Sequence, residues 1–142
     1  MEDEPSIAVG PLKIWVHGRQ FPDAHDYWDG NWLSVTARCE GAGSRVQVTD
    51  PFIHLGELKK WKEDISVLAR TLKGSVELPT IEPTLKVKIA DQGTTLGQFS
   101  VEIDLGGDHI SERHHFSGGL DQSYFAGLLA QLSAILRAYP VR

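Results

Sequence analysis

Hydrophobic and polar residues alternate in three stretches of the first third of the chain, at residues 11–17, 32–39 and 46–53. A period of two is the period of side chains along a β-strand, where successive residues point to opposite faces. Gly-Ala-Gly-Ser at 41–44 interrupts the pattern between the second and third stretches. Pro51 lies inside the third stretch, so this strand is expected at a sheet edge or beside a bulge. The pattern predicts three strands that pair as antiparallel neighbours.

Two longer segments follow the period of a helix instead. In residues 55–72 the apolar residues recur at spacings of three and four, and charged residues fill the other face. This spacing predicts an amphipathic helix of about four turns, closed by Gly74. A second apolar stripe follows Asp121, a good N-cap residue, and ends before Pro140. The apolar residues of the two stripes are Leu58, Trp61, Ile65, Leu68 and Leu72, and then Tyr124, Phe125, Leu128, Leu129, Leu132, Ile135, Leu136 and Tyr139.

Four short strands are predicted between these two helices. They cover residues 75–78, 84–89, 96–105 and 109–116. The second and third alternate regularly and are joined by a Gly-containing turn, which is typical of antiparallel strands with one buried face. Lys86 and Lys88 of one strand are then expected opposite Glu102 and Asp104 of the next, where opposite charges stabilise the pairing.

The order of the elements is three strands, a helix, four strands and a helix. Because short turns join successive strands and each helix carries one apolar stripe, we expect a single α+β domain. It should contain one antiparallel sheet of about six to seven strands with the two amphipathic helices packed on it. Residues 11–142 are assigned to this domain, and the polar residues 1–10 to a flexible N-terminal arm.

The composition is that of an ordinary globular protein. The chain has 142 residues, of which 41% are hydrophobic and 23% are charged. Its formal net charge is −5 and its pI is about 5.6. This balance lacks the basic footprint that DNA or RNA phosphates require, so no nucleic-acid binding is expected. The mild acidity suits a basic protein partner better.

Cys39 is the single cysteine, which excludes an intramolecular disulfide and any zinc site built on paired cysteines. The sequence starts with Met-Glu-Asp-Glu-Pro, whereas a signal peptide starts with cationic and then apolar residues. Its apolar runs all fall short of the roughly 18 residues that span a bilayer. We therefore expect a cytoplasmic protein without a membrane partner.

Residues 21–33 have the most unusual composition in the chain. They contain Tyr27, two of the four tryptophans and three carboxylates. The Asp-Gly-Asn sequence within them favours a tight turn, since Gly and Asn adopt positive φ readily and Asp side chains bond nearby backbone groups. Trp28 and Trp32 are expected to fold into the core and hold this turn in place. The residues expected to remain at the surface and contact a partner are Asp23, Asp26, Tyr27 and Asp29.

The sequence contains none of the catalytic patterns that we considered. The carboxylates between 23 and 31 recur every third residue, without the oxygen positions and the glutamate of a calcium-binding EF-hand loop. Cys39 lies at the end of a predicted strand with no nucleophile motif around it, as expected for a small buried hydrophobic residue. Asp26 and Asp29 form a carboxylate pair, but a chain with 19 acidic residues offers many such pairs. We therefore predict no enzyme, no catalytic residue and no cofactor.

Three of the six histidines cluster in residues 109–115, among several acidic residues. If this segment is a strand, the adjacent His114 and His115 point to opposite faces and cannot share one ion without a bulge. No two histidines have the spacing of a His-Glu-x-x-His site. Solvated histidines are therefore expected rather than a metal site. The alternative hypothesis is a domain that binds a metal or small ligand, or catalyses a reaction, through the segment from His109 to His115.

Residues 26–33, Asp-Tyr-Trp-Asp-Gly-Asn-Trp-Leu, resemble the signature of the WapI family of bacterial immunity proteins. Further features that agree with this resemblance are the helix from Leu58 to Leu72, the hairpin at Gly93, and Asp121-Gln122-Ser123-Tyr124 opening a terminal helix that ends at Pro140. The resemblance extends from about Ile14 to Val141. It implies a fold shared over most of the chain.

The resemblance also implies a function: a non-enzymatic, cytosolic protein that binds and neutralises a cognate secreted toxin, such as a nuclease. Such a protein blocks the toxin's active site with acidic side chains or binds the toxin elsewhere. A surface that has to match varied toxins should not itself be fixed, so Trp28, Gly30 and Trp32 of the shared motif are expected to be structural. A gene for a large secreted protein with a small toxic tail is expected beside this one. A further hypothesis is a structural or regulatory module of an unrelated complex.

Overall fold

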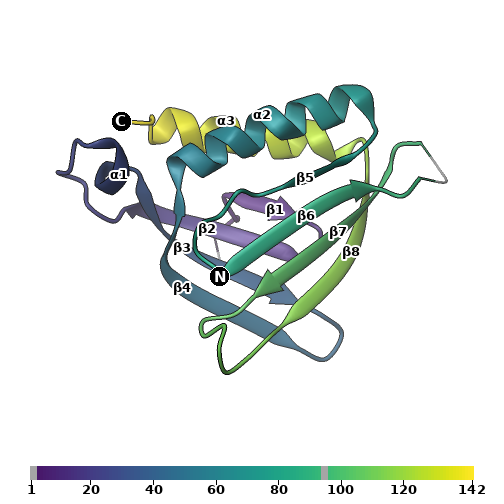
Figure 1. Ribbon diagram of the computed structural model, residues 1–142, viewed down its shortest axis with the longest axis horizontal. Helices are drawn as coiled ribbons and strands as arrows, with labels where there is room; N and C mark the ends of the chain where they lie inside the picture. The colour runs from purple at the N-terminus through teal and green to yellow at the C-terminus, as the bar shows by residue number, and fades with distance from the viewer. Residues whose placement is uncertain (1–2, 94–95) are drawn as a thin grey trace.

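The computed structural model describes residues 3–93 and 96–142, which form two four-stranded antiparallel sheets and three helices (Figure 1). The strands are paired in the orders β1-β2-β3-β4 and β5-β6-β7-β8, so each sheet is a meander of consecutive strands. The first sheet consists of β1 (Ile7–Val9), β2 (Leu12–Arg19), β3 (Trp32–Glu40) and β4 (Arg45–His54). The second consists of β5 (Ser75–Glu77), β6 (Leu85–Asp91), β7 (Gln98–Leu105) and β8 (His115–Asp121). The helices are α1 (Tyr27–Gly30), α2 (Leu55–Thr71) and α3 (Tyr124–Ala138).

The predicted single α+β domain is confirmed, but the prediction of one sheet with six to seven strands is wrong. Helix α2 carries the chain from β4 to β5, and in the described part of the chain each sheet pairs only its own four strands. The pattern missed β1, because three residues are too few to show alternation. Ile7 and Val9 of β1 are nonetheless buried, and Ile7 pairs with Ile14. The first sheet thus begins inside residues 1–10, which the sequence assigned to an arm.

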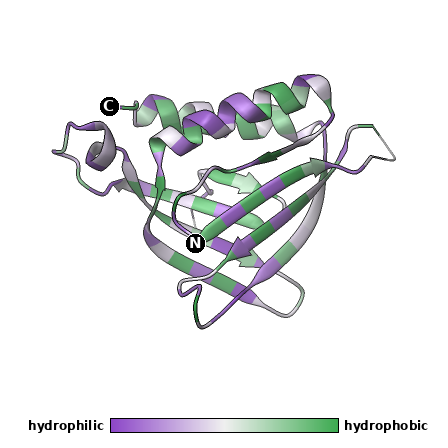
Figure 2. Ribbon diagram, in the orientation of Figure 1, coloured by the Kyte–Doolittle hydropathy of each residue, from purple (hydrophilic) through white to green (hydrophobic). Residues whose placement is uncertain are grey.

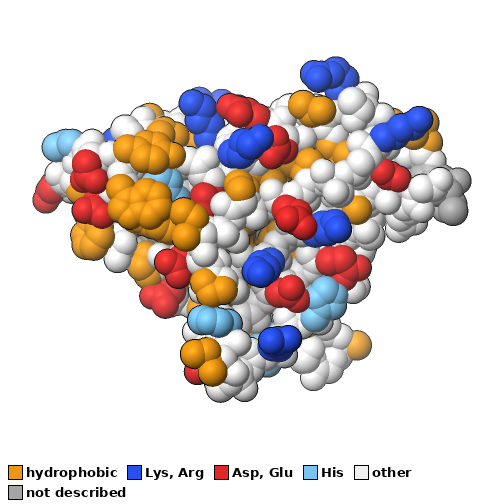
Figure 3. Space-filling view, in the orientation of Figure 1, with side chains coloured by type: hydrophobic (Ala, Val, Ile, Leu, Met, Phe, Trp, Pro, Cys, Tyr) orange, Lys and Arg blue, Asp and Glu red, His pale blue; other side chains and the backbone are white. Residues whose placement is uncertain are grey.

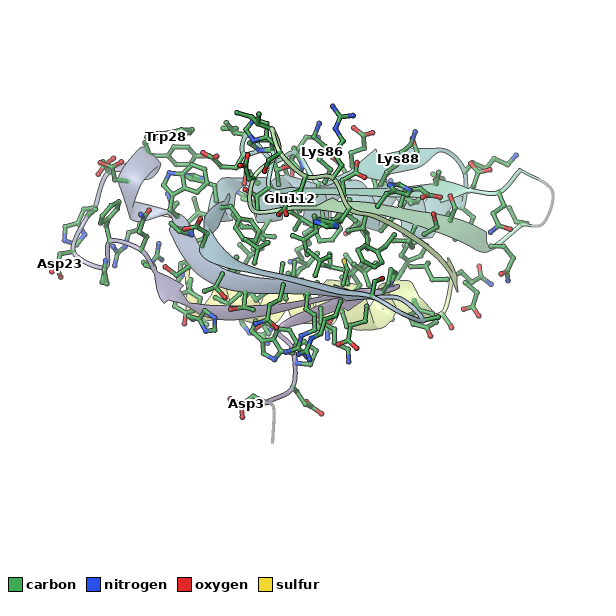
Figure 4. The ribbon with its side chains drawn as sticks, turned by 90° about the horizontal axis from the view of Figure 1, so that it is seen from below. Asp3, Asp23, Trp28, Lys86, Lys88 and Glu112 are labelled. Carbon is green, nitrogen blue, oxygen red and sulfur yellow. The ribbon has the colours of Figure 1, made fainter. Side chains whose placement is uncertain are left out.

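The core lies between the two sheets and beneath the two long helices. Figure 4 shows one sheet above the other, and Figure 1 shows α2 and α3 side by side along one edge of the sheets. Buried side chains from both sheets and both helices form one hydrophobic cluster. Its largest members include Trp61, Phe99 and Phe125, and the rings of Phe99 and Phe125 meet edge to face at 4.8 Å. The alternating colours along β6 and β7 in Figure 2 follow this burial, because only one face of each strand packs on the core.

Both predicted helices are present, but they are capped by other residues than predicted. Helix α2 ends at Thr71 and its C-cap is Leu72, whose φ of 58° is left-handed and whose N–H donates to the carbonyl oxygen of Leu68. Gly74 also has a positive φ but lies two residues further on. Helix α3 begins after Ser123, and the carboxylate of Asp121 accepts a hydrogen bond from the Ser123 backbone N–H at 2.8 Å. In the described residues no helix is long and apolar enough to cross a membrane.

Strands with residues unfavourable for pairing lie at sheet edges. Strand β4 contains Pro51 and is an edge of the first sheet, with a shift in register opposite it between Leu33 and Val35. This confirms the prediction of an edge or a bulge. Strand β8 is an edge of the second sheet, where the glycines at 118 and 119 are tolerated. The prediction of a strand over residues 109–116 is wrong for most of that range, because β8 begins at His115 and continues to Asp121.

Candidate functional site

The connection between β2 and β3 projects from one end of the molecule, and we call its residues 21–31 the α1 lobe (Figure 1). Its helix α1 is a single turn that begins after Asp26. Oδ2 of Asp26 accepts a hydrogen bond from the backbone N–H of Asp29 at 2.8 Å. This side-chain cap satisfies one of the N–H groups left free at the start of a helix. The turn predicted here is therefore a capped helical turn.

Asn31 fixes the lobe to the C-terminal segment of the chain. Its side chain is fully buried. Nδ2 donates to the carbonyl oxygens of Tyr27 at 2.7 Å and Arg142 at 3.1 Å. Oδ1 accepts from the Arg142 backbone N–H at 2.9 Å and from Nη1 of Arg19 at 3.2 Å. Because both donors and both acceptor sites of the amide are used, Asn31 has one defined orientation and holds three segments together.

Two arginines support the base of the lobe by donating to its carbonyl oxygens. Nη1 of Arg19 donates to Gly30 at 2.6 Å, and Nη1 of Arg142 donates to Pro22 and Ala24, both at 2.6 Å. Burial, and the nearby charge of Arg142, lower the pKa of Arg19. A Cβ atom on Gly30 would lie 2.5 Å from the carbonyl oxygen of Ala24, so only glycine fits there. The sequence reasoning missed both arginines, because they lie outside the lobe in the chain.

His54 connects the lobe to α2. Its side chain is buried, and its Nδ1 accepts a hydrogen bond from the backbone N–H of Gly56 at 3.0 Å. Nδ1 is therefore the unprotonated nitrogen and Nε2 carries the ring proton. Nε2 lies 3.2 Å and 3.3 Å from the carbonyl oxygens of Tyr27 and Trp28, to which it donates. One ring thus caps α2 and binds the backbone of α1.

Glu57 completes the cap of α2 and connects it to the second half of the chain. Oε1 accepts from the backbone N–H of His54 at 2.8 Å, and Oε2 accepts from that of Ile81 at 2.7 Å. Burial raises the pKa of the Glu57 carboxyl, and these two N–H groups oppose the rise. The start of α2, which supports the lobe, is therefore fixed from both sides.

The rings of Tyr27, Trp28, Trp32 and His54 form an aromatic cluster. The His54 ring lies 5.0 Å from both Tyr27 and Trp32 and 5.3 Å from Trp28. Trp32 is only 9% exposed, but Trp28 is 50% and Tyr27 is 54% exposed. The prediction that both tryptophans fold into the core is confirmed for Trp32 and wrong for Trp28. Trp32 begins a central strand, whereas Trp28 lies on a helical turn outside the sheets.

All four residues predicted to contact a partner are exposed on the lobe. Asp23, Asp26 and Asp29 belong to the same lobe as the exposed rings of Tyr27 and Trp28, and Phe21 of the lobe is exposed as well. Figure 3 shows red acidic side chains next to orange hydrophobic ones at the end of the molecule where the lobe projects, and Figure 4 places Asp23 and Trp28 at this end. The lobe itself contains no lysine or arginine. It therefore presents aromatic surface and three carboxylates together.

The histidine segment is a loop for most of its length. His115, at the start of β8, has Nδ1 2.7 Å from Oδ1 of Asp104 and Nε2 2.6 Å from Oε2 of Glu102. Hydrogen bonds to Asp104 and Glu102 raise the pKa of His115, and hydrogen bonds from Ser117 and His115 lower the pKa of Glu102. Within residues 3–93 and 96–142, no three His, Cys, Asp or Glu side chains are grouped so that they could hold a metal ion.

Cys39 does not have the surroundings of a nucleophile. It lies in β3 and is fully buried. Burial raises the pKa of its thiol to about 12. Since the thiolate is the nucleophilic form, this cysteine serves the core, as the sequence predicted.

The family of the chain follows from a comparison with family models. The model of the Immunity protein WapI-like family matches residues 6–140, which is nearly the whole chain. The chain therefore belongs to this family, as the resemblance of residues 26–33 indicated. No curated protein sequence matches the chain.

The fold is similar to that of the plant transcriptional regulator PBF-2, with a TM-score of 0.53 and 12% sequence identity over 90% of this chain and 75% of that one. Two structures with a TM-score of 0.45 are less similar. One is a guide-RNA-binding protein complex, 12% identical over 91% of both chains. The other is MRP1/MRP2 of a trypanosome, 13% identical over 92% of this chain and 86% of that one. At such low identity these likenesses concern the fold alone.

Proposed function

We propose that this protein is a non-enzymatic immunity protein that binds and neutralises a cognate toxin through the α1 lobe. The observation that carries the choice of surface is the exposure of Tyr27 and Trp28 beside three carboxylates on a rigid support. Membership of the immunity family supports the role, and the lobe supplies a surface suited to it.

The aromatic part of the lobe has the properties of a binding hot spot. Tyr27 and Trp28 are each about half exposed, although both rings could bury a large apolar area. Tyr and Trp are the side chains most enriched among residues that dominate interface energies. Their backbone carbonyls are held by His54 and Asn31, so docking would cost little ordering of the lobe.

The charges of the lobe favour a basic toxin surface. Asp23, Asp26 and Asp29 contribute three negative charges to a chain whose net charge is −5. Charge complementarity of this kind accelerates encounter and rejects acidic partners. A basic toxin that acts on nucleic acid, such as a nuclease, would present a suitable surface, and the complex would form in the cytoplasm.

The proposal is tested with the toxic C-terminal domain of the secreted protein whose gene is expected next to this one. The chain should bind that domain and rescue cells that express it. A Tyr27→Ala/Trp28→Ala double variant should weaken binding at least about a hundredfold, because truncating a hot spot costs about 2 kcal/mol or more per residue. An Asp23→Asn/Asp29→Asn variant should bind more slowly and lose less affinity.

Matched variants outside the lobe serve as controls. Tyr124→Ala removes an equally exposed tyrosine from α3, and Asp50→Asn/Glu63→Gln changes the net charge by the same amount as the lobe variant. Both should bind the toxin like the wild type. Failure of the wild-type chain to bind or rescue contradicts the function, whereas rescue by a folded Tyr27→Ala/Trp28→Ala variant contradicts only the surface.

A further inference from the structure

A cavity of about 440 Å³ opens where the loop before β8 meets the outer face of the second sheet. Lys86 of β6 and Asp104 of β7 line it from the sheet. The loop contributes Glu112 and Arg113, and His115 lines it from the start of β8. Figure 4 shows Lys86 on the side of the second sheet that faces away from the first sheet. We call this space the loop cavity; none of its lining residues belongs to the α1 lobe.

Hydrogen bonds within the loop and between the loop and β7 support the loop wall of the cavity. Oδ1 of Asp108 accepts from the backbone N–H of Ile110 at 3.0 Å, and Oδ2 accepts from the Ser111 hydroxyl at 2.8 Å. These bonds, the Ser111 hydroxyl first, lower the pKa of Asp108. The backbone N–H of Leu105 donates to the carbonyl oxygen of His114 at 3.1 Å, which attaches the end of the loop to β7. A ligand would therefore meet a wall that is already formed.

The two carboxylates of the cavity already have partners. Oδ1 of Asp104 lies 2.7 Å from Nδ1 of His115, and Oε2 of Glu112 lies 3.6 Å from Nε2 of His114. The strand register places Lys86 opposite Asp104, yet the Asp104 carboxylate binds His115 instead. Among the residues that the structure describes, the interactions include no ion pair for Lys86 or for Arg113.

We propose that the loop cavity binds the phosphate or carboxylate group of a small anionic molecule, held by Lys86 and Arg113. Arg113 and Lys86 line the same cavity and have no ion pair among the described residues. Proteins hold phosphate and carboxylate groups with these two side chains: the arginine guanidinium can donate two parallel hydrogen bonds, and the lysine ammonium supplies a compact positive charge. The cavity volume is within the range of small-molecule sites. The ring of His115 is hydrogen-bonded to the carboxylates of Asp104 and Glu102, so these two nearby carboxylates have a partner other than Lys86. This site would be independent of toxin binding.

NMR titration of the purified full chain with inorganic phosphate, and separately with citrate, tests this site. Backbone amides of residues 104–115 should shift and saturate, at a Kd of about 1 mM or below. The Lys86→Gln/Arg113→Gln variant should weaken binding at least about tenfold, because each substitution removes a charge-assisted hydrogen bond. Lys62→Gln/Arg70→Gln, which removes the same charge from α2, should bind like the wild type.

Three results would overturn the proposal. The first is the absence of saturable shifts at about 10 mM of either anion. The second is equal shifts from sodium chloride at matched ionic strength, which would indicate only screening. The third is unchanged affinity in Lys86→Gln/Arg113→Gln when its amide spectrum shows a native fold. None of these results bears on toxin binding, because the lobe contributes nothing to this cavity.

Discussion

At the scale of single residues, Asn31 holds the α1 lobe in place. Replacing it by leucine removes four hydrogen bonds, including both bonds that Asn31 makes to the backbone N–H and carbonyl oxygen of Arg142. Asn31→Leu should therefore lower the free energy of unfolding by about 2 to 5 kcal/mol, measured by urea denaturation. As a control, Gln98→Leu at an exposed position of β7 should change the free energy of unfolding by less than about 0.5 kcal/mol. Equal effects would contradict the role of Asn31.

The two tryptophans of the motif should differ in their contribution to stability. Trp32→Ala should cost about 3 to 5 kcal/mol, because the ring is buried. Trp28→Ala should cost less, since Trp28 is already 50% exposed to water. Asp26→Ala should cost about 1 kcal/mol through loss of the α1 cap, and Asp23→Ala almost nothing. Urea midpoints that show a larger loss for Trp28→Ala than for Trp32→Ala would overturn this assignment.

His115 should titrate above the ordinary histidine pKa of 6.5, because Asp104 and Glu102 stabilise its charged form. The stability that it contributes is fully present below the unfolded-state pKa and is lost as the pH rises through the raised folded-state pKa. An NMR titration of the imidazole resonances measures this shift. Asp104→Asn/Glu102→Gln should lower the value, and an unchanged value in that variant would show that the two carboxylates are not the cause.

Residue chemistry in the sequence identified the exposed acids and Tyr27 of the lobe but not the orientation of Trp28. A tryptophan side chain can pack in the core or form part of an exposed binding surface. The position of Trp28 on α1, outside the sheets, is what places it at the surface. His54 gave no sequence signal, because its role depends on α1 and α2 meeting at its ring.

At the scale of elements, replacing a glycine by alanine should stabilise the chain where a Cβ atom has space and destabilise it where the backbone is crowded. Gly127 lies within α3, and a Cβ atom added there would meet nothing within 4 Å, so Gly127→Ala should raise the free energy of unfolding by up to about 1 kcal/mol. Gly30→Ala should lower it, because the new Cβ would meet the carbonyl oxygen of Ala24 at 2.5 Å. Thermal melting of both variants tests the difference in sign, and stabilisation by Gly30→Ala would contradict the observed packing of the lobe.

Elements with a long periodic pattern could be predicted from the sequence, and short or irregular ones could not. Helix α2 and the pairing of Lys86 with Asp104 and Lys88 with Glu102 agree with the prediction. The short strand β1 carries too little pattern, and β8 contains two glycines that disfavour a strand away from an edge. The helix caps are at Leu72 and Ser123 rather than at Gly74 and Asp121.

At the scale of the whole molecule, the chain repeats one plan: a four-stranded meander followed by a helix. The sequence predicted the α+β class but not two sheets, because periodicity shows which face of a strand is buried and not which strand it pairs with. The first unit differs from the second by the α1 lobe between β2 and β3. This insertion carries the exposed aromatic and acidic surface, outside the layers that form the core.

The most direct test of the lobe as the toxin-binding surface is amide hydrogen exchange of the chain, free and in complex with its cognate toxin domain. Amides of residues 21–31 should exchange more slowly in the complex, together with those at the start of α2 that support the lobe. The outer face of the second sheet should exchange at the same rate in both states. Unchanged exchange in the lobe, with protection confined to another surface, would contradict the assignment of the lobe as the binding surface.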